Sequence, residues 1–279
     1  MTETQLLNWQ DVPITNNFMF SKIMSDKSLC KEFLEVMMEI RIDHLEEVSA
    51  EATHKVDPYS KAVRFDVYVK DSTRIFDVEM QMSDTLELPK RSRYYQSVCD
   101  MDSLEAGKFY SDLKESYVIF ICPFDLFGKE LPCYTFETVC LENGAVRLDD
   151  KTHKLFYNFT ACQRELNKSR RSVLQYFAEG KPDGPLARQL DRRLEEAKVN
   201  VKWRAEFMTL EMELIGREKV GHKLGLAEGI EIGTARGTKN GALQNARETA
   251  KRMLDANMPL IQIAQFTGLK IEEIENLSK

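Results

Sequence analysis

Two acidic residues, Asp66 and Glu79, stand out as candidates for chemistry. Twelve residues separate them, and each lies in a stretch of alternating apolar and polar residues, 63–70 and 75–82, that is typical of a β-strand. The short polar segment 71–74 between these stretches predicts a hairpin. Carboxylates brought together on neighbouring strands repel each other. Because a divalent cation between them would relieve that repulsion, the spacing indicates a metal site.

The alternation also predicts which residues of the hairpin face each other. Successive side chains of a strand point to opposite faces, and a slip of one residue would expose an apolar row. A tight turn pairs Asp71 with Arg74. Counting back places Asp66 opposite Glu79, with Cβ atoms about 4.5–5.5 Å apart. The apolar rows are Val63, Phe65, Val67 and Val69 with Phe76, Val78, Met80 and Met82, and the opposite face holds Arg64, Asp66, Tyr68 and Lys70 with Ile75, Asp77, Glu79 and Gln81.

A carboxylate pair of this kind suits the hydrolysis of a phosphodiester. Mg²⁺ binds one or two carboxylates and keeps several waters, and it can polarise a phosphoryl oxygen and supply an activated water. The alternative is an exposed sheet face on which Arg64, Lys70 and Arg74 neutralise the carboxylates without a metal. The residues of the hairpin alone leave both interpretations open.

The segments around the hairpin predict an α/β fold. Apolar residues recur at helical spacing over 16–40, with a break and a new N-cap at 25–28. The order of elements is helix, three strands, helix and further strands, which favours a central mixed sheet flanked by helices. The elements that we expect after the first helices are a strand at 45–53, a turn at 57–60, the hairpin, a helix at 90–113 and strands at 117–124, 133–140 and 155–159.

The remainder of the chain predicts an all-helical C-terminal extension in three parts. Residues 161–220 are charged, with eleven Lys/Arg against six Asp/Glu between 161 and 204, which indicates either a solvated face or a phosphate-facing patch. Residues 221–243 carry a Gly at every fourth position, as in an oligomerising helix or a flexible connector. Residues 244–279 predict three short helices that resemble a helix-turn-helix with Gly268 at the turn. Ile271, Ile274 and Leu277 would form the buried face of the last one, and the tail would serve as a DNA reader or an interaction module.

Composition limits the classes of function. The 279 residues are 43% apolar and 30% charged, enough to bury a core. The net charge of −6 argues against DNA binding through a global positive field, so contacts with phosphate must come from local basic patches. The six cysteines form no C-x-x-C pair, which disfavours a zinc site. With no apolar run of about 18 residues and no signal peptide, we expect no membrane span and a cytoplasmic location.

Several strings of the sequence resemble the PD-(D/E)XK nuclease family transposases, which are related to the Rpn recombination-promoting nucleases. Asp66 followed by Glu79-Met80-Gln81 is similar to the D…(D/E)-x-K motif of the PD-(D/E)XK nucleases. The resemblance covers about residues 13–160. The strings that carry it are 63–70, 78–81, 90–96, 107–110 and 118–125.

The resemblance implies a restriction-endonuclease-like core over 13–160 and a DNA endonuclease linked to recombination or mobile elements. It implies that Asp66 and Glu79 are catalytic and bind Mg²⁺ or Mn²⁺, with the main-chain carbonyl of Met80 as a further ligand. In this fold the helix after the second hairpin strand lies beside the site, so we expect Arg91 and Tyr94 to contact DNA.

The chain departs from the motif at Gln81, where the superfamily has Lys. Gln can position water by neutral hydrogen bonds but stabilises negative charge less, and Lys70 on the same predicted face is expected to supply the charge. Related sequences also carry an acidic residue near the first helix, where this chain has Asn16 and Asn17. A catalytically inactive descendant that binds DNA or self-associates therefore stays an alternative.

A transposase with a triad of acidic residues is a competing class of enzyme. It needs a third acidic residue late in the chain, for which Glu195, Glu196 and Glu206 are available. No motif distinguishes them within their charged helical tract, so the nuclease interpretation is preferred.

Overall fold

The computed structural model describes residues 7–54 and 62–277. The predicted turn at 57–60 lies outside the described residues. The chain divides between Thr209 and Leu210 into two compact units, and each is described by itself. In the part of the chain that the structure describes, no helix is long and apolar enough to cross a membrane.

A six-stranded sheet forms the centre of the first unit, in the order β1-β2-β3-β4-β6-β5. β1–β2, β2–β3 and β5–β6 pair antiparallel, whereas β3–β4 and β4–β6 pair parallel. The mixed sheet predicted from the order of elements is confirmed. The strands are β1 (Leu45–His54), β2 (Val63–Asp71), β3 (Arg74–Met80), β4 (Glu115–Cys122), β5 (Cys133–Phe136) and β6 (Thr152–Asn158).

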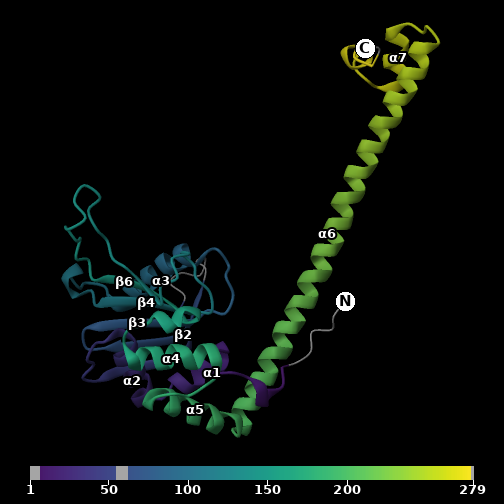
Figure 1. The fold of residues 1–279 in the computed structure, drawn as a ribbon. Coiled ribbons are helices and arrows are strands. Elements are labelled where there is room, and N and C mark those ends of the chain that lie inside the picture. The colour runs from purple at the N-terminus through teal and green to yellow at the C-terminus, as the bar shows by residue number, and fades with distance from the viewer. Residues whose placement is uncertain (1–6, 55–61, 278–279) are drawn as a thin grey trace. The chain divides into compact units, whose positions relative to one another are not determined.

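Helices cover both faces of this sheet (Figure 1). α3 connects the parallel strands β3 and β4 and lies on one face, while α1, α2, α4 and α5 lie on the other. The start of α2 confirms the predicted break, since the Asp26 side chain accepts hydrogen bonds from the first turn of the helix. The helices are α1 (Asn17–Met24), α2 (Lys27–Met38), α3 (Leu88–Ser103), α4 (Lys168–Glu179) and α5 (Pro185–Lys198), with short 3₁₀ turns η1 (Trp9–Asp11), η2 (Tyr110–Asp112) and η3 (Phe159–Arg164).

Two predicted elements are shorter in the structure. The helix expected at 90–113 ends at Ser103, because Leu104 is extended and Gly107 has a φ of 90°. The strand expected at 133–140 ends at Phe136. A β-strand needs a partner for its main chain, and beyond Phe136 only an isolated bridge from Val139 to Arg147 is formed within the described residues.

The long helix α6 (Val201–Asp255) begins in the first unit, where Phe207 packs with Trp9 and Phe18 at ring distances of 5.2 and 5.6 Å. Residues 221–243 are helical within α6, and the space around each of their glycines is open. The first of the three helices predicted for the tail is therefore the end of α6, and not a separate helix.

The second unit has a small core of its own. It joins the end of α6 to α7 (Leu260–Thr267) and α8 (Ile271–Glu275) around buried Ala250, Ile263 and Ile274. Gly268, with a φ of 70°, ends α7 at the predicted turn. Ile274 is buried as expected, but Ile271, at the first position of α8, is 43% exposed.

Candidate active site

The β2–β3 hairpin has the predicted register. Its pairs include Val67 with Val78 and Lys70 with Ile75. Continued by one residue, this register sets Asp66 opposite Glu79. The alternation of apolar residues and the tight turn at 71–74 together predicted this register.

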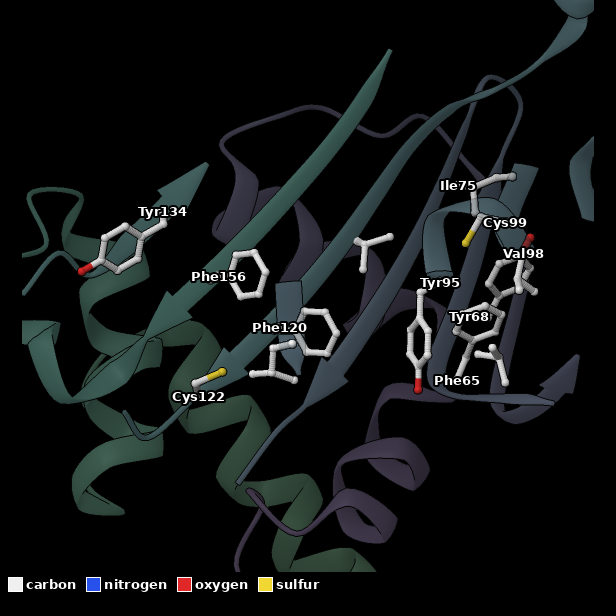
Figure 2. Packing of buried hydrophobic residues seen from close by; sticks show 13 residues of the cluster. Phe65, Tyr68, Ile75, Tyr95, Val98, Cys99, Phe120, Cys122, Tyr134 and Phe156 are labelled. Atoms are coloured by element: carbon white, nitrogen blue, oxygen red, sulfur yellow. The ribbon is translucent and has the colours of Figure 1, made fainter. Parts of the chain in front are cut away.

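The prediction that Val63 and Phe65 lie on the face opposite Tyr68 was wrong. Both residues belong to the same buried cluster as Tyr68, and the Phe65 ring stacks on the Tyr68 ring at 5.1 Å (Figure 2). The alternation is interrupted beside Glu51 of β1, which has a φ of 55°. β1 and β2 pair regularly on either side of this residue. Asp66 lies at this interruption, between Phe65 and the regular part of β2.

Asp66 and Glu79 are held together through the main chain of the hairpin. The main-chain N–H of Asp66 donates to Oε1 of Glu79 at 2.9 Å, and the N–H of Met80 donates to Oδ2 of Asp66 at 3.0 Å. From α1, Nδ2 of Asn17 donates to the same Asp66 oxygen at 3.2 Å. The structure thus brings together the three residues that the sequence assigned to the metal, and adds Asn17.

The carboxylate pair is buried without enough positive charge to compensate it. Glu79 is 1% exposed, and burial together with the neighbouring Asp66 raises the pKa of Glu79 to about 8. Burial also raises the pKa of Asp66 to about 6. Desolvation and a like charge cause these raised pKa values, and the nearby Arg91 offsets them only in part.

A third carboxyl group, Asp77, was not assigned a role from the sequence. Its side chain is 0% exposed, and neither oxygen has a hydrogen-bond partner within the described residues. Burial, followed by the charges of Glu79 and Asp66, raises the pKa of Asp77 well above its ordinary value. The signal was present in the sequence, since Asp77 and Glu79 are two positions apart and so share a strand face.

Arg91, on α3, contacts the site directly. Its Nη2 forms an ion pair with Oε2 of Glu79, and its Nη1 donates to Oε1 of Gln81 at 2.6 Å. The guanidinium lies over the rings of Tyr95 and Phe120, at 4.8 and 5.3 Å from their centroids. The sequence predicted a place beside the site for Arg91, but not its contacts with Glu79 and Gln81.

The other two predicted residues lie elsewhere. The Lys70 ammonium group contacts Asp102 at 2.7 Å and Glu47 at 3.7 Å. The structure therefore does not bring Lys70 to Asp66 and Glu79. Tyr94 is partly exposed and lines an open cavity of about 470 Å³ together with Arg91.

The residues present fit a divalent cation. Two carboxylates and the Met80 carbonyl are oxygen donors, which Mg²⁺ and Mn²⁺ prefer. The buried Asp77 oxygens without partners and the raised pKa values of the carboxylate pair locate a deficit of positive charge at this point. Among residues 7–54 and 62–277, no group of three or more His, Cys, Asp or Glu side chains is placed to hold a metal. The ligand set that the resemblance implies has only two such side chains, Asp66 and Glu79, besides the Met80 carbonyl.

Comparison with known proteins identifies the family of the chain. No curated protein and no solved structure was found to match the chain. Residues 15–171, more than half of the chain, match the sequence model of a family described as PD-(D/E)XK nuclease family transposase. This range includes all six strands of the sheet as well as Asp66, Glu79 and Arg91. The chain therefore belongs to the PD-(D/E)XK nuclease family transposases.

Proposed function

We propose that the protein is a DNA endonuclease that requires Mg²⁺ or Mn²⁺. The observation that supports this best is the interlocked Asp66–Glu79 pair, in which two carboxylates meet with Arg91 as the cation in contact with Glu79. Membership of the family supports a function related to nucleases or transposases. The metal dependence, the catalytic activity and a link to DNA recombination or mobile elements are our proposal.

In this proposal the residues of the site have different roles. Asp66, Glu79 and the Met80 carbonyl hold the ion, which when bound polarises the phosphate and activates water. The Gln81 amide helps to orient the reacting groups. Lys70 would have to leave Asp102 and Glu47 in order to take part, so its catalytic role stays a prediction.

We propose that the DNA backbone lies against α3. The open cavity of about 470 Å³ is lined by Lys90, Arg91 and Tyr94, which combine positive charge with an aromatic ring, as surfaces that bind nucleic acid do. Because the chain has a net charge of −6, it needs a local basic surface of this kind to bind DNA. The cytoplasmic location stays a prediction.

The test is cleavage of supercoiled plasmid by the purified protein with Mg²⁺, Mn²⁺, Ca²⁺ or EDTA. We expect nicking with Mg²⁺ or Mn²⁺, and its loss in Asp66→Asn and Glu79→Gln, which keep the size of each side chain but remove its charge. Glu105→Gln, at an exposed position after α3, is the control and should cleave like the wild type. Circular dichroism checks that each variant is folded.

If the folded wild type cuts no DNA with any metal, the chain is better described as a catalytically inactive relative. The alternative functions are then DNA binding and self-association. For self-association the supporting observation is α6, which exposes its row of glycines together with Leu224 and Ile230. Glycines with open space around them let another helix approach closely. Packing between the two helices would then offset the cost of each glycine to helix stability, about 1 kcal/mol.

A further inference from the structure

Each cation of the hairpin forms an ion pair with a carboxylate other than Asp66 or Glu79, although the charge of Arg64 also lowers the pKa of Asp66. Arg64 forms an ion pair with Glu51, Lys70 with Asp102, and Arg74 with Asp71. These are the three residues that could have neutralised the site from β2 and β3. The positive charge that contacts Glu79 comes instead from α3, through Arg91.

Arg91 is held in one orientation. The rings of Tyr95 and Phe120 support one side of the guanidinium, and Glu79 and Gln81 accept hydrogen bonds from its two terminal nitrogens. A planar guanidinium that is stacked and hydrogen-bonded in this way loses little further freedom when it binds an anion. Gln81 therefore acts on Arg91 as a positioning residue, through its Oε1.

The same guanidinium reaches solvent. The Arg91 side chain is 29% exposed and lines the open cavity beside Lys90 and Tyr94. Arginine has five N–H donors, so donors remain free even if Tyr95 accepts one as well as Glu79 and Gln81. Because Arg91 both contacts Glu79 and lines this cavity, a phosphate there would meet its remaining donors.

We propose that Arg91 is a catalytic residue of this site, which binds a non-bridging oxygen of the scissile phosphodiester and stabilises its growing negative charge. This inference rests on the proposed nuclease function. In the hydrolysis, the oxygen of water bonds to phosphorus and the P–O bond to one flanking sugar breaks. The leaving sugar oxygen takes a proton from the water, so the products are a phosphate monoester and a hydroxyl. Neutral Gln81 cannot supply the charge that this step needs.

The test moves the positive charge from position 91 to position 81. Arg91→Met keeps the length of the side chain but removes its charge, and we expect kcat to fall by about 100-fold or more, the usual effect of losing one donor at a developing negative charge. Adding Gln81→Lys to Arg91→Met returns a cation to the neighbouring position, and we expect kcat to recover at least about tenfold. A purely structural role of Arg91 would not be rescued by a Lys at position 81, directly after β3.

A control and a second measurement separate this role from others. Arg93→Met makes the same change at an exposed position of α3 and should leave kcat unchanged. Binding of Mn²⁺ alone, followed by electron paramagnetic resonance, should be at least as tight in Arg91→Met, because a neighbouring positive charge has been removed. If the affinity for Mn²⁺ falls in step with kcat, Arg91 serves to orient the metal ligand and the inference is overturned.

The outcomes distinguish this inference from the proposed function. If the wild type cleaves DNA, Asp66→Asn does not, and Arg91→Met cleaves at the wild-type rate, the nuclease stands and the role of Arg91 is overturned. The same holds if the double variant is no faster than Arg91→Met. If the wild type cleaves no DNA with any metal, both proposals are overturned.

Discussion

At the scale of residues, the site keeps groups that weaken the fold. Asp66, Asp77 and Glu79 are buried or half-buried within one part of the sheet, and the pKa of each is raised. A carboxyl group whose pKa is raised by folding binds protons more tightly in the folded state. Its contribution to stability is complete at low pH and is lost as the pH rises through the folded pKa.

We predict from this that Asp77→Asn stabilises the protein at high pH. The amide has the size of the carboxyl group but cannot ionise, so the penalty that grows above the unfolded pKa of about 4 disappears. The gain is about 1.4 kcal/mol for each unit by which folding raises the pKa. Urea denaturation in EDTA between pH 4 and 8 measures it.

The difference between Asp77→Asn and the wild type should vanish toward pH 4, where both groups are neutral. Asp43→Asn, at an exposed position, is the control and should not change this pH dependence. A variant less stable than the wild type at pH 8 would show that Asp77 stabilises the fold as a carboxylate.

At the scale of elements, a buried ion pair joins the end of η3 to α4 and α2. Glu165 accepts hydrogen bonds from Arg170 at 2.7 and 3.0 Å and from the main chain of Asn167 at 2.9 Å. Arg170 also donates to the Met37 carbonyl at the end of α2 at 3.1 Å. Burial by itself would raise the pKa of Glu165, but the hydrogen bonds and charge of Arg170 outweigh it and lower the pKa.

We predict that Glu165→Gln lowers the free energy of unfolding at pH 7 by about 2–3 kcal/mol, because it removes the buried one of the two carboxylates that pair with Arg170 and leaves only the exposed Glu39. A lowered pKa means that this stability is present above the unfolded value and is lost as the pH falls through the folded pKa. Chemical denaturation should therefore find a loss at pH 7 that shrinks below about pH 4.

The matched control is Glu130→Gln, which breaks an exposed pair with Arg164. Exposed pairs contribute less than about 1 kcal/mol. Equal losses in Glu130→Gln and Glu165→Gln would contradict the argument from burial.

At the scale of the whole molecule, the boundary between the units falls inside α6. The buried ring of Phe207 packs with Trp9 and Phe18 in the first unit, whereas the contacts of Leu210 and the residues after it belong to the second. The division into parts at 13–160, 161–220, 221–243 and 244–279 stays a prediction.

We predict that a chain truncated after Thr209 keeps its fold and any cleavage activity. Its unfolding temperature should lie within about 4 °C of the full chain, the shift that 1 kcal/mol causes at this size. Truncation after Asn200 removes Phe207, and loss of a buried Phe side chain costs about 3–5 kcal/mol, so the temperature should drop further. Calorimetry compares the three chains.

The same truncation tests self-association. If α6 joins copies of the chain, the full-length protein has a higher mass in light scattering than the chain truncated after Thr209. Equal masses per chain, both monomeric, would remove the self-association alternative while leaving the nuclease proposal unaffected.

The sequence by itself determined the local geometry of this protein. Strand alternation has a period of two that can be read over a few residues, and together with the tight turn at 71–74 it predicted the register that pairs Val67 with Val78. The N-cap at Asp26 and the turn at Gly268 were equally local. The family strings, now confirmed as a match over 15–171, added the type of fold.

Only the tertiary structure decided what surrounds the carboxylates. Arg91 reaches Glu79 from the next helix, and Asn17 reaches Asp66 from 49 residues away. The face that holds Asp77 is covered by α3, which turns a polar row into a buried one. These contacts depend on which helix packs against which face. The packing of the whole core sets that choice, and residues distant in sequence contribute to this packing. The periodicity of a short segment therefore cannot predict it.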